Sequence, residues 1–134
     1  MSTVNKLIVK IRLKLSDLEV KIYSPYEVIE AINEAKQELL TTAEKYYASY
    51  SFKYDKNDIE ADDNDSGWPD FFDNTLVECA VIILSPGDYL AKEQAKENWR
   101  RKTVSLLSRY STETGIEVKY YHDLSYLYDN IGGS

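Results

Sequence analysis

The sequence predicts an all-α protein, a small four-helix bundle with an extended C-terminal arm. One long segment repeats apolar residues at steps of three and four behind a capping signal, as an amphipathic helix does. A nearly continuous apolar run is followed by a Pro-Gly break and a charged segment, which is typical of two helices joined by a turn. Since residues 113–134 lose this period and are rich in tyrosine, we predict a helical domain, residues 1–112, and a docking arm, residues 113–134.

Length and composition set broad limits on the function. The 134 residues, 43% of them hydrophobic, suffice for one domain with a single core. The net charge of -7 argues against a protein that grips nucleic acid through its phosphates, because that requires a clustered basic face. The start lacks a signal-peptide pattern and the apolar runs are too short to cross a bilayer. We therefore expect a protein made and used in cytoplasm, without a membrane partner.

The segment 4–22 fits two structures. One face of a helix would collect most of its apolar residues, but apolar and basic residues also alternate from Val9 to Leu15, as in a strand. A hairpin would turn at Ser16-Asp17, which lacks the Gly or Asn that tight hairpins need. Local pattern leaves helix and hairpin open. The residues of the helical face are Val4, Leu7, Ile8, Ile11 and Leu15.

A second helix has a clear start. Ser24 is placed as its N-cap, Pro25 as its first residue, and Glu27 as the partner that closes a capping box. The apolar period then continues, so we predict helix as far as Tyr50. A long polar and acidic loop follows, and we expect Trp68-Pro69 to anchor its end.

The third and fourth helices form an antiparallel hairpin. The third begins near Pro69 or Asp70 and is so apolar that it must be covered on most sides. Pro86-Gly87 ends it, Asp88 can cap the fourth helix, and Gly115 stops that helix. The predicted apolar stripe of the fourth helix is Ala91, Ala95, Trp99, Leu106 and Tyr110. The lone Cys79 lies in the third helix, where we expect a small core residue.

The order of these motifs resembles the head-to-tail connector, or adaptor, proteins of tailed bacteriophages. It runs from "RLKLSD" through "YSPYEVIEAINEAKQEL" to an acidic loop and then "WPDFFDNTLVECAVIILSPGDYLAKEQAKENWRRKTVSLL". The resemblance covers roughly residues 3–110, and its order and spacing are more specific than any single motif. The matching positions are Asp17, Tyr23, Ser24, Glu27, Ile32, Asn33, Ala35, Trp68, Pro69 and Trp99.

The resemblance implies a structural virion protein and not an enzyme. Such proteins are small helical bundles that form a ring, usually a dodecamer, beneath the portal protein. The ring extends the DNA channel without binding DNA specifically and docks a tail or neck protein. This implies a place in the virion neck after assembly in host cytoplasm, and it favours the helix for residues 4–15. The alternative is a monomeric phage-encoded helical protein that binds and modulates a host protein.

Interface residues are expected on the fourth helix and the arm. Arg100 and Arg101 have two explanations: a solvated face with pairs such as Glu97 with Arg101, or contact with an acidic neighbour. An aromatic arm would be a costly exposed patch unless another surface covers it. Its strand-like start, residues 116–121, could add to a strand of another chain. The arm positions are Ile116, Val118, Tyr120, Tyr121, Tyr126 and Tyr128.

The acidic loop has two candidate roles. Acidic residues that line a channel would repel the phosphates of passing DNA, and we assign this role to Asp58, Asp62, Asp63 and Asp65. The span Asp62 to Asp73 also matches the ligand spacing of an EF-hand calcium loop, with Gly67 at the sharp turn. Asp73 is shorter than the usual bidentate Glu, so we favour a solvated loop over a calcium site. Because His122 and Cys79 lack partners at ligand or catalytic spacing, we expect no catalytic residue, cofactor or metal.

Overall fold

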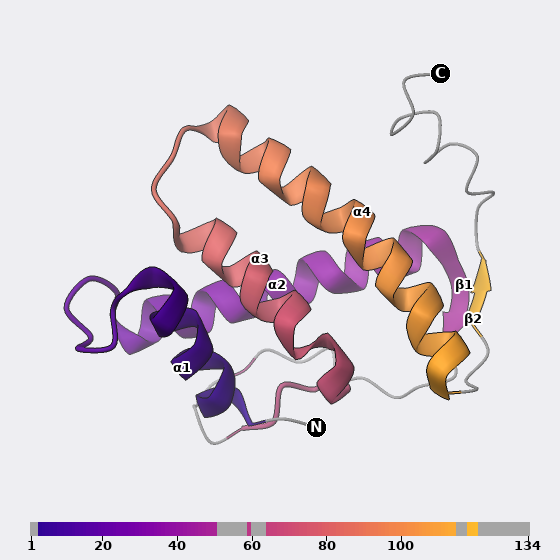
Figure 1. The fold of residues 1–134 in the computed structure, drawn as a ribbon, viewed down its shortest axis with the longest axis horizontal. Helices are drawn as coiled ribbons and strands as arrows, with labels where there is room; N and C mark the ends of the chain where they lie inside the picture. Colours follow the sequence, from indigo (N-terminus) through magenta and orange to yellow (C-terminus); the bar gives the residue numbers. More distant parts are fainter. Residues whose placement is uncertain (1–2, 51–58, 60–63, 115–117, 121–134) are drawn as a thin grey trace.

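The structure, a computed structural model, describes residues 3–50, 59, 64–114 and 118–120 (Figure 1). These residues are mostly helical, which confirms the predicted all-α class. The arm from residue 121 onward lies outside the described residues. The elements are α1 (Val4–Leu15), α2 (Pro25–Tyr46), β1 (Tyr47–Tyr50), the 3-10 turn η1 (Asp70–Phe72), α3 (Asp73–Leu84), α4 (Tyr89–Thr114) and β2 (Val118–Tyr120).

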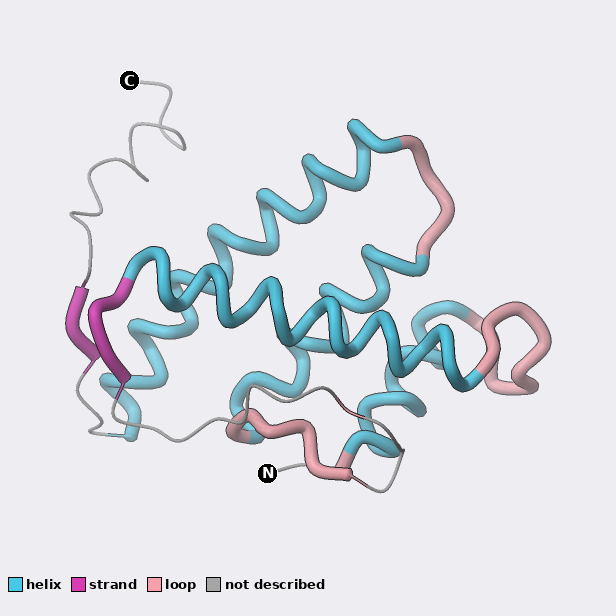
Figure 2. The backbone as a smooth tube through the Cα atoms, turned by 180° about the vertical axis from the view of Figure 1, so that it is seen from behind, coloured by secondary structure: helices cyan, strands magenta, loops and turns pink. Residues whose placement is uncertain are grey.

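Helix α3 is the centre of the fold and packs against α1, α2 and α4 (Figures 1 and 2). Its apolar sequence requires cover on most sides, and Leu76, Val77, Cys79 and Ala80 are indeed buried. The last turn of α3 is only half-buried. The core residues that α1 and α2 contribute are Val4, Leu7, Ile11, Val28, Ala31, Ile32, Ala35, Leu39 and Ala43.

The segment 4–15 is a helix, so the hairpin alternative is wrong there. The helix ends at Ser16, whose φ of 56° lies in the left-handed region that often closes helices. Thr3 stands at the N-cap position but makes no side-chain cap. The amide of Val4 instead donates to the carbonyl of Asn64 at 2.8 Å. The end of the acidic loop therefore satisfies the first turn of α1.

Aromatic rings join the loop before α3 to the end of α4. Trp68 is 1% exposed, which confirms that it anchors the loop. Its ring meets Phe72 edge-on with centroids 5.6 Å apart, and Tyr110 lies 5.3 Å from Phe72 and 5.1 Å from Phe71. Edge and tilted pairs of this kind add to the stabilisation that burial supplies.

Helix α2 stops at Tyr46, so the prediction of helix to Tyr50 is wrong. Residues Tyr47–Tyr50 form β1, which pairs antiparallel with β2. Tyr47 stands opposite Tyr120, and Tyr50 stands opposite Val118. Aromatic residues favour strands, and an available partner strand outweighed the helical period here. The strand predicted within 116–121 therefore pairs inside its own chain.

Helix α4 departs from the predicted stripe at its start. Trp99, Val104 and Leu107 are buried, but Ala91 is exposed. Ala91 lies in the first turn of α4, where no residue is buried and where Lys92 ties the helix to α3 by donating to the carbonyl of Ile83 at 2.9 Å. Asp88 caps the helix as predicted, since its Oδ1 accepts the amide of Ala91 at 2.8 Å. The helix runs to Thr114, two residues past the predicted domain boundary, and Gly115 follows it.

Candidate docking surface at the first helix and its loop

The outward side of α1 combines basic and apolar side chains. Lys6, Lys10 and Lys14 follow one another at intervals of four, so they share one face of the helix. Val9 and Leu13 lie beside them and are exposed. The loop to α2 continues this surface with three more exposed apolar residues. We define the α1 face as Lys6, Val9, Lys10, Leu13, Lys14, Leu18, Val20 and Ile22.

Several exposed large apolar side chains lie around one end of the helical bundle. That end holds the α1–α2 loop and the α3–α4 turn, at the left of Figure 1 and the right of Figure 2, away from the β1–β2 pair. Contiguous exposed apolar surface is rare on monomers and marks sites of association. The exposed large apolar residues are Val9, Leu13, Leu18, Val20, Ile22, Tyr26, Tyr89 and Leu90.

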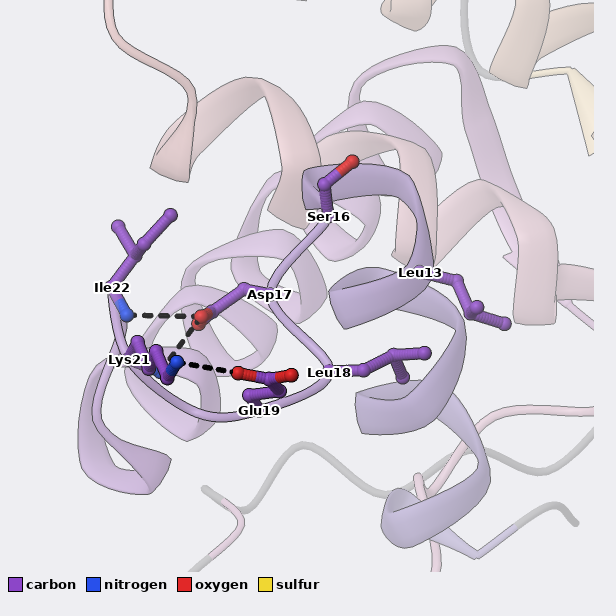
Figure 3. Close-up of a pocket in the computed structure, with 7 residues that line it drawn as sticks. All are labelled: Leu13, Ser16, Asp17, Leu18, Glu19, Lys21 and Ile22. Atoms are coloured by element: carbon purple, nitrogen blue, oxygen red, sulfur yellow. Dashed lines mark hydrogen bonds and ion pairs between the residues drawn. The ribbon is translucent and has the colours of Figure 1, made fainter.

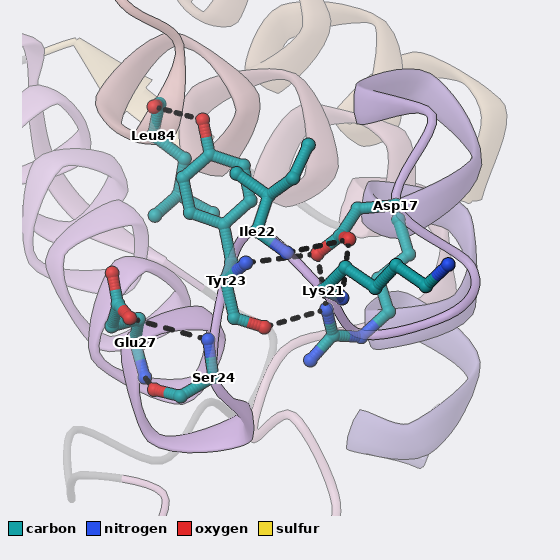
Figure 4. A network of polar contacts seen from close by, with 8 residues as sticks. Asp17, Lys21, Ile22, Tyr23, Ser24, Glu27 and Leu84 are labelled. Atoms are coloured by element: carbon teal, nitrogen blue, oxygen red, sulfur yellow. Dashed lines mark hydrogen bonds and ion pairs between the residues drawn. The ribbon is translucent and has the colours of Figure 1, made fainter.

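One buried carboxylate organises the α1–α2 loop (Figure 4). The Oδ1 atom of Asp17 accepts the amides of Lys21 and Ile22 at 2.8 and 2.9 Å, and its Oδ2 atom accepts that of Tyr23 at 3.0 Å. Arg12 donates to Asp17 Oδ2 at 2.8 Å and to the Tyr23 carbonyl at 2.9 Å. The backbone amides at the end of the loop thus turn inward to Asp17, while the apolar side chains of Leu18, Val20 and Ile22 lie outside.

The loop surface is hollowed (Figure 3). A shallow pocket of about 480 Å³ lies beside Leu13, Asp17, Leu18 and Ile22, and the side chains of Leu13 and Leu18 point to the same side. Val20 has a φ of 58°, which costs a β-branched residue about 1–3 kcal/mol. Leu18 is 57% exposed and Ile22 is 63% exposed. The lining also includes the polar Ser16, Glu19 and Lys21, so the pocket can receive a partner side chain of mixed polarity.

The loop is fixed to the bundle at its far end. The amide of Ser24 donates to Glu27 Oε1 at 3.2 Å, and the amide of Glu27 donates to Ser24 Oγ at 3.1 Å. This confirms the predicted capping box. The hydroxyl of Tyr23 donates to the carbonyl of Leu84 at 2.8 Å and so joins the loop to the end of α3. A partner would therefore meet a preformed surface.

The predicted interface arginines pair within their own chain. Arg100 contacts Glu38 of α2 at 3.1 Å and Glu97 at 3.3 Å. Partial burial alone would lower the pKa of Arg100, but the charges and hydrogen bonds of Glu38 and Glu97 outweigh it and raise that pKa. The expected pair of Arg101 with Glu97 is present at 3.7 Å. These contacts account for the cluster, and contact with a neighbouring subunit stays a prediction.

The acidic loop is described at residues 59 and 64–69. Ile59 is buried and pairs with Asn33 of α2, whose side chain accepts its amide at 2.7 Å and donates to its carbonyl at 3.0 Å. Asp65 is exposed and forms a backbone bridge with Thr3. Asp58, Asp62 and Asp63 lie outside the described residues, so their channel role stays a prediction.

Ser66 and Trp68, which stand at the fifth and seventh positions of the EF-hand spacing that begins at Asp62, bond to each other. The Ser66 hydroxyl donates to the Trp68 carbonyl at 3.1 Å and accepts the Trp68 amide at 3.2 Å. Both residues are buried. Within residues 3–50, 59, 64–114 and 118–120, no group of three or more His, Cys, Asp or Glu side chains could hold a metal ion.

The remaining predicted residues divide into two groups. Val118 and Tyr120 belong to β2, while four arm positions lie outside the described residues: Ile116, Tyr121, Tyr126 and Tyr128.

Cys79 is buried as predicted. Burial, with a smaller effect of the Glu38 charge, raises its pKa to about 12, so the thiol stays protonated near neutral pH. Across the described part of the chain, no helix is both long and apolar enough to span a bilayer.

Comparison with protein families, curated proteins and solved structures finds no match to this chain.

The α1 face was not predicted from the sequence. Val9 and Leu13 fitted the strand alternative for residues 4–22, so they offered no separate signal. Once the segment is known to be a helix, these residues fall outside its buried face and beside Lys10 and Lys14. An apolar pair four residues apart on the polar side of a helix is the signal that could have revealed this surface.

The Asp17 loop makes a pH-dependent contribution to stability. Burial would raise the pKa of Asp17, but the amides of Tyr23, Ile22 and Lys21 and the charge of Arg12 outweigh it and lower that pKa. The contribution is complete above the unfolded pKa of about 3.9 and is lost as the pH falls through the lower folded pKa. We expect Asp17→Asn to be less stable than the native chain at pH 7 and the difference to shrink below pH ~4.

Urea unfolding of both proteins at several pH values measures this effect. Glu19→Gln is a matched control, because Glu19 is an exposed carboxylate in the same loop. It should leave stability nearly unchanged at every pH. A stability difference between Asp17→Asn and the native chain that stays constant with pH would contradict the role given to the Asp17 charge.

Proposed function

We propose that this protein is a head-to-tail adaptor: a structural subunit that forms a ring beneath a phage portal, extends the DNA channel and docks the tail. The observation that carries the proposal is the group of exposed apolar side chains around the α1–α2 loop and the α3–α4 turn. A subunit that functions only in an assembly must expose such surface when it is alone. The order of the capped helix, anchored loop and helical hairpin matches what the resemblance implies.

The charge of the chain also supports a DNA conduit. With a net charge of -7, a ring of these subunits would repel the phosphate backbone and let DNA slide through without specific binding. The dodecameric ring, the portal and tail partners, and the place in the virion neck are parts of this proposal. So is a C-terminal arm that docks onto the portal or a neighbouring subunit.

Mass determination of the protein alone and mixed with its portal protein tests the proposal. We expect a high-order complex whose mass is a multiple of the 15.5 kDa subunit, and electron microscopy should show a ring against the portal. Removal of residues 117–134 should abolish portal docking and leave the helical content of the subunit intact. A protein that stays monomeric in both conditions would contradict an adaptor and support the alternative, a monomeric modulator of a host protein.

A further inference from the structure

A second charged surface lies on α2. Glu27, Glu30 and Glu34 are spaced by three and four residues, so they share one side of that helix, and all three are exposed. Tyr26, 70% exposed, stands at the start of this row. We define the α2 stripe as Tyr26, Glu27, Glu30 and Glu34. It presents acidic groups beside one large aromatic ring.

The α1 face has the opposite charge. Its lysines Lys6, Lys10 and Lys14 stand out on a chain whose net charge is -7. Among the described residues, none of these three lysines forms an ion pair. Arg12 differs from these lysines because it is buried and its guanidinium forms an ion pair with Asp17. The α1 face is therefore a local basic surface whose charges are available to a partner.

The two surfaces match in length as well as in charge. At 1.5 Å per residue, Lys6 to Lys14 spans about 12 Å of helix, and Glu27 to Glu34 spans about 10 Å. Val9 and Leu13 lie among the lysines, and Tyr26 lies beside the acids. Each surface thus offers a charged row with apolar area next to it, which is the composition expected of the two sides of one contact.

The two charged rows, which lie wholly within the described part of the chain, do not pair within one molecule, because no ion pair joins the lysines of the α1 face to the acids of the α2 stripe. In Figure 1 α1 lies in front and α2 behind, and Figure 2, turned by 180°, shows α2 in front. A contact between the α1 face and the α2 stripe would therefore join different molecules. It uses two different patches of the same chain, so each copy can bind one neighbour on either side. Such head-to-tail contacts build closed rings or open filaments.

We propose that the α1 face of one copy binds the α2 stripe of the next copy, and that this is the contact that repeats around the assembly. The inference rests on the proposed function, because it names the subunit contact of that ring. Lys6, Lys10 and Lys14 pair with the acidic row. The apolar residues of the α1 face cover Tyr26 and lose their exposure to water.

Charge reversal and its compensation test the contact. We expect Lys10→Glu with Lys14→Glu to weaken assembly by about tenfold or more, because attraction becomes repulsion. Glu30→Lys with Glu34→Lys should have the same effect. A mixture of the two variants should associate again. The acidic α1 face of the first variant then meets the basic α2 stripe of the second, so the charges attract. Lys102→Glu is the control: it reverses a lysine on α4, outside both surfaces, and should assemble as the native chain does.

The readout is the mass distribution against protein concentration, with thermal unfolding to show that each variant is folded. Rings that form normally from the Lys10→Glu, Lys14→Glu variant would overturn this contact and leave the adaptor proposal standing. A native chain that stays monomeric, alone and with its portal, would overturn both. Sedimentation with phosphatidylserine vesicles that requires Lys10 and Lys14, in a chain whose assembly does not, would identify an anionic lipid surface as the partner and overturn the proposal.

Discussion

Replacement of Phe72 by alanine is expected to destabilise the protein by about 3–5 kcal/mol. Phe72 is fully buried at the junction of the anchored loop, η1 and α4. Its ring lies 5.6 Å from that of Trp68 and 5.3 Å from those of Phe71 and Tyr110. The substitution removes both the buried area and these ring contacts and leaves a cavity. A loss of this size approaches the total stability of many small domains, about 5–15 kcal/mol.

Chemical denaturation of the variant and of the native chain measures this loss. Tyr89→Ala is a matched control, because it also deletes an aromatic ring but at a position that is 79% exposed. It should change the free energy of unfolding by no more than about 0.5 kcal/mol. If Phe72→Ala cost as little as its control, the aromatic junction would not be part of the cooperative core.

Replacement of Trp99 by alanine is expected to cost a similar 3–5 kcal/mol. Trp99 is 3% exposed, and its indole N–H donates to the Thr75 carbonyl of α3 at 2.8 Å. It is the first buried residue along α4, whose earlier residues are exposed or half-buried. Its loss should therefore detach α4 from α3 over the middle of the hairpin.

Trp99→Phe separates the hydrogen bond from the packing. Phenylalanine retains most of the apolar contact and cannot donate, so we expect a loss of about 1–2 kcal/mol, between the native chain and the alanine variant. Urea unfolding, followed by circular dichroism, gives both values. Equal losses in the two variants would mean that the indole hydrogen bond and not the buried ring dominates at this position.

Local sequence rules predicted the elements whose signals lie within a few residues. The Ser24–Glu27 capping box and the Asp88 cap are each formed by side chains and amides three residues apart. The burial of α3 follows from its composition, because a helix that is apolar on nearly every side has no stable exposed orientation. The same reasoning predicts the anchoring role of Trp68, because a large apolar side chain at the end of a polar loop is stable only when it is buried.

The wrong predictions concern segments whose structure depends on contacts with residues far away in the sequence. The helical period continues past Tyr46, yet β2, whose residues are 68 to 73 positions further along the chain than their partners, pairs with Tyr47–Tyr50. The choice between helix and hairpin in residues 4–22 depended on whether α3 would cover a helical face. Ala91 fitted the stripe of α4, but it lies in the first turn of that helix, where no residue is buried.

At the candidate docking surface, too, local sequence pattern and tertiary structure give different information. From the sequence, Asp17 was only a candidate turn position, whereas in the fold it gathers the amides of Lys21, Ile22 and Tyr23 beside the buried Arg12. That arrangement turns Leu18 and the other apolar residues of the loop outward. Burial and outward direction depend on which helices meet, so the sequence alone could not identify the α1 face.

The sequence by itself determined that this chain is helical, where α2 and α4 begin, and that α3 lies inside. These properties depend on caps, helical period and composition, which act over one or two turns. Only the tertiary structure decided where α2 ends, which apolar residues remain exposed, and that the lysines of α1 and the acids of α2 do not pair with each other. The reason is physical: exposure and pairing are set by contacts between segments far apart in the chain, and α3 brings those segments together.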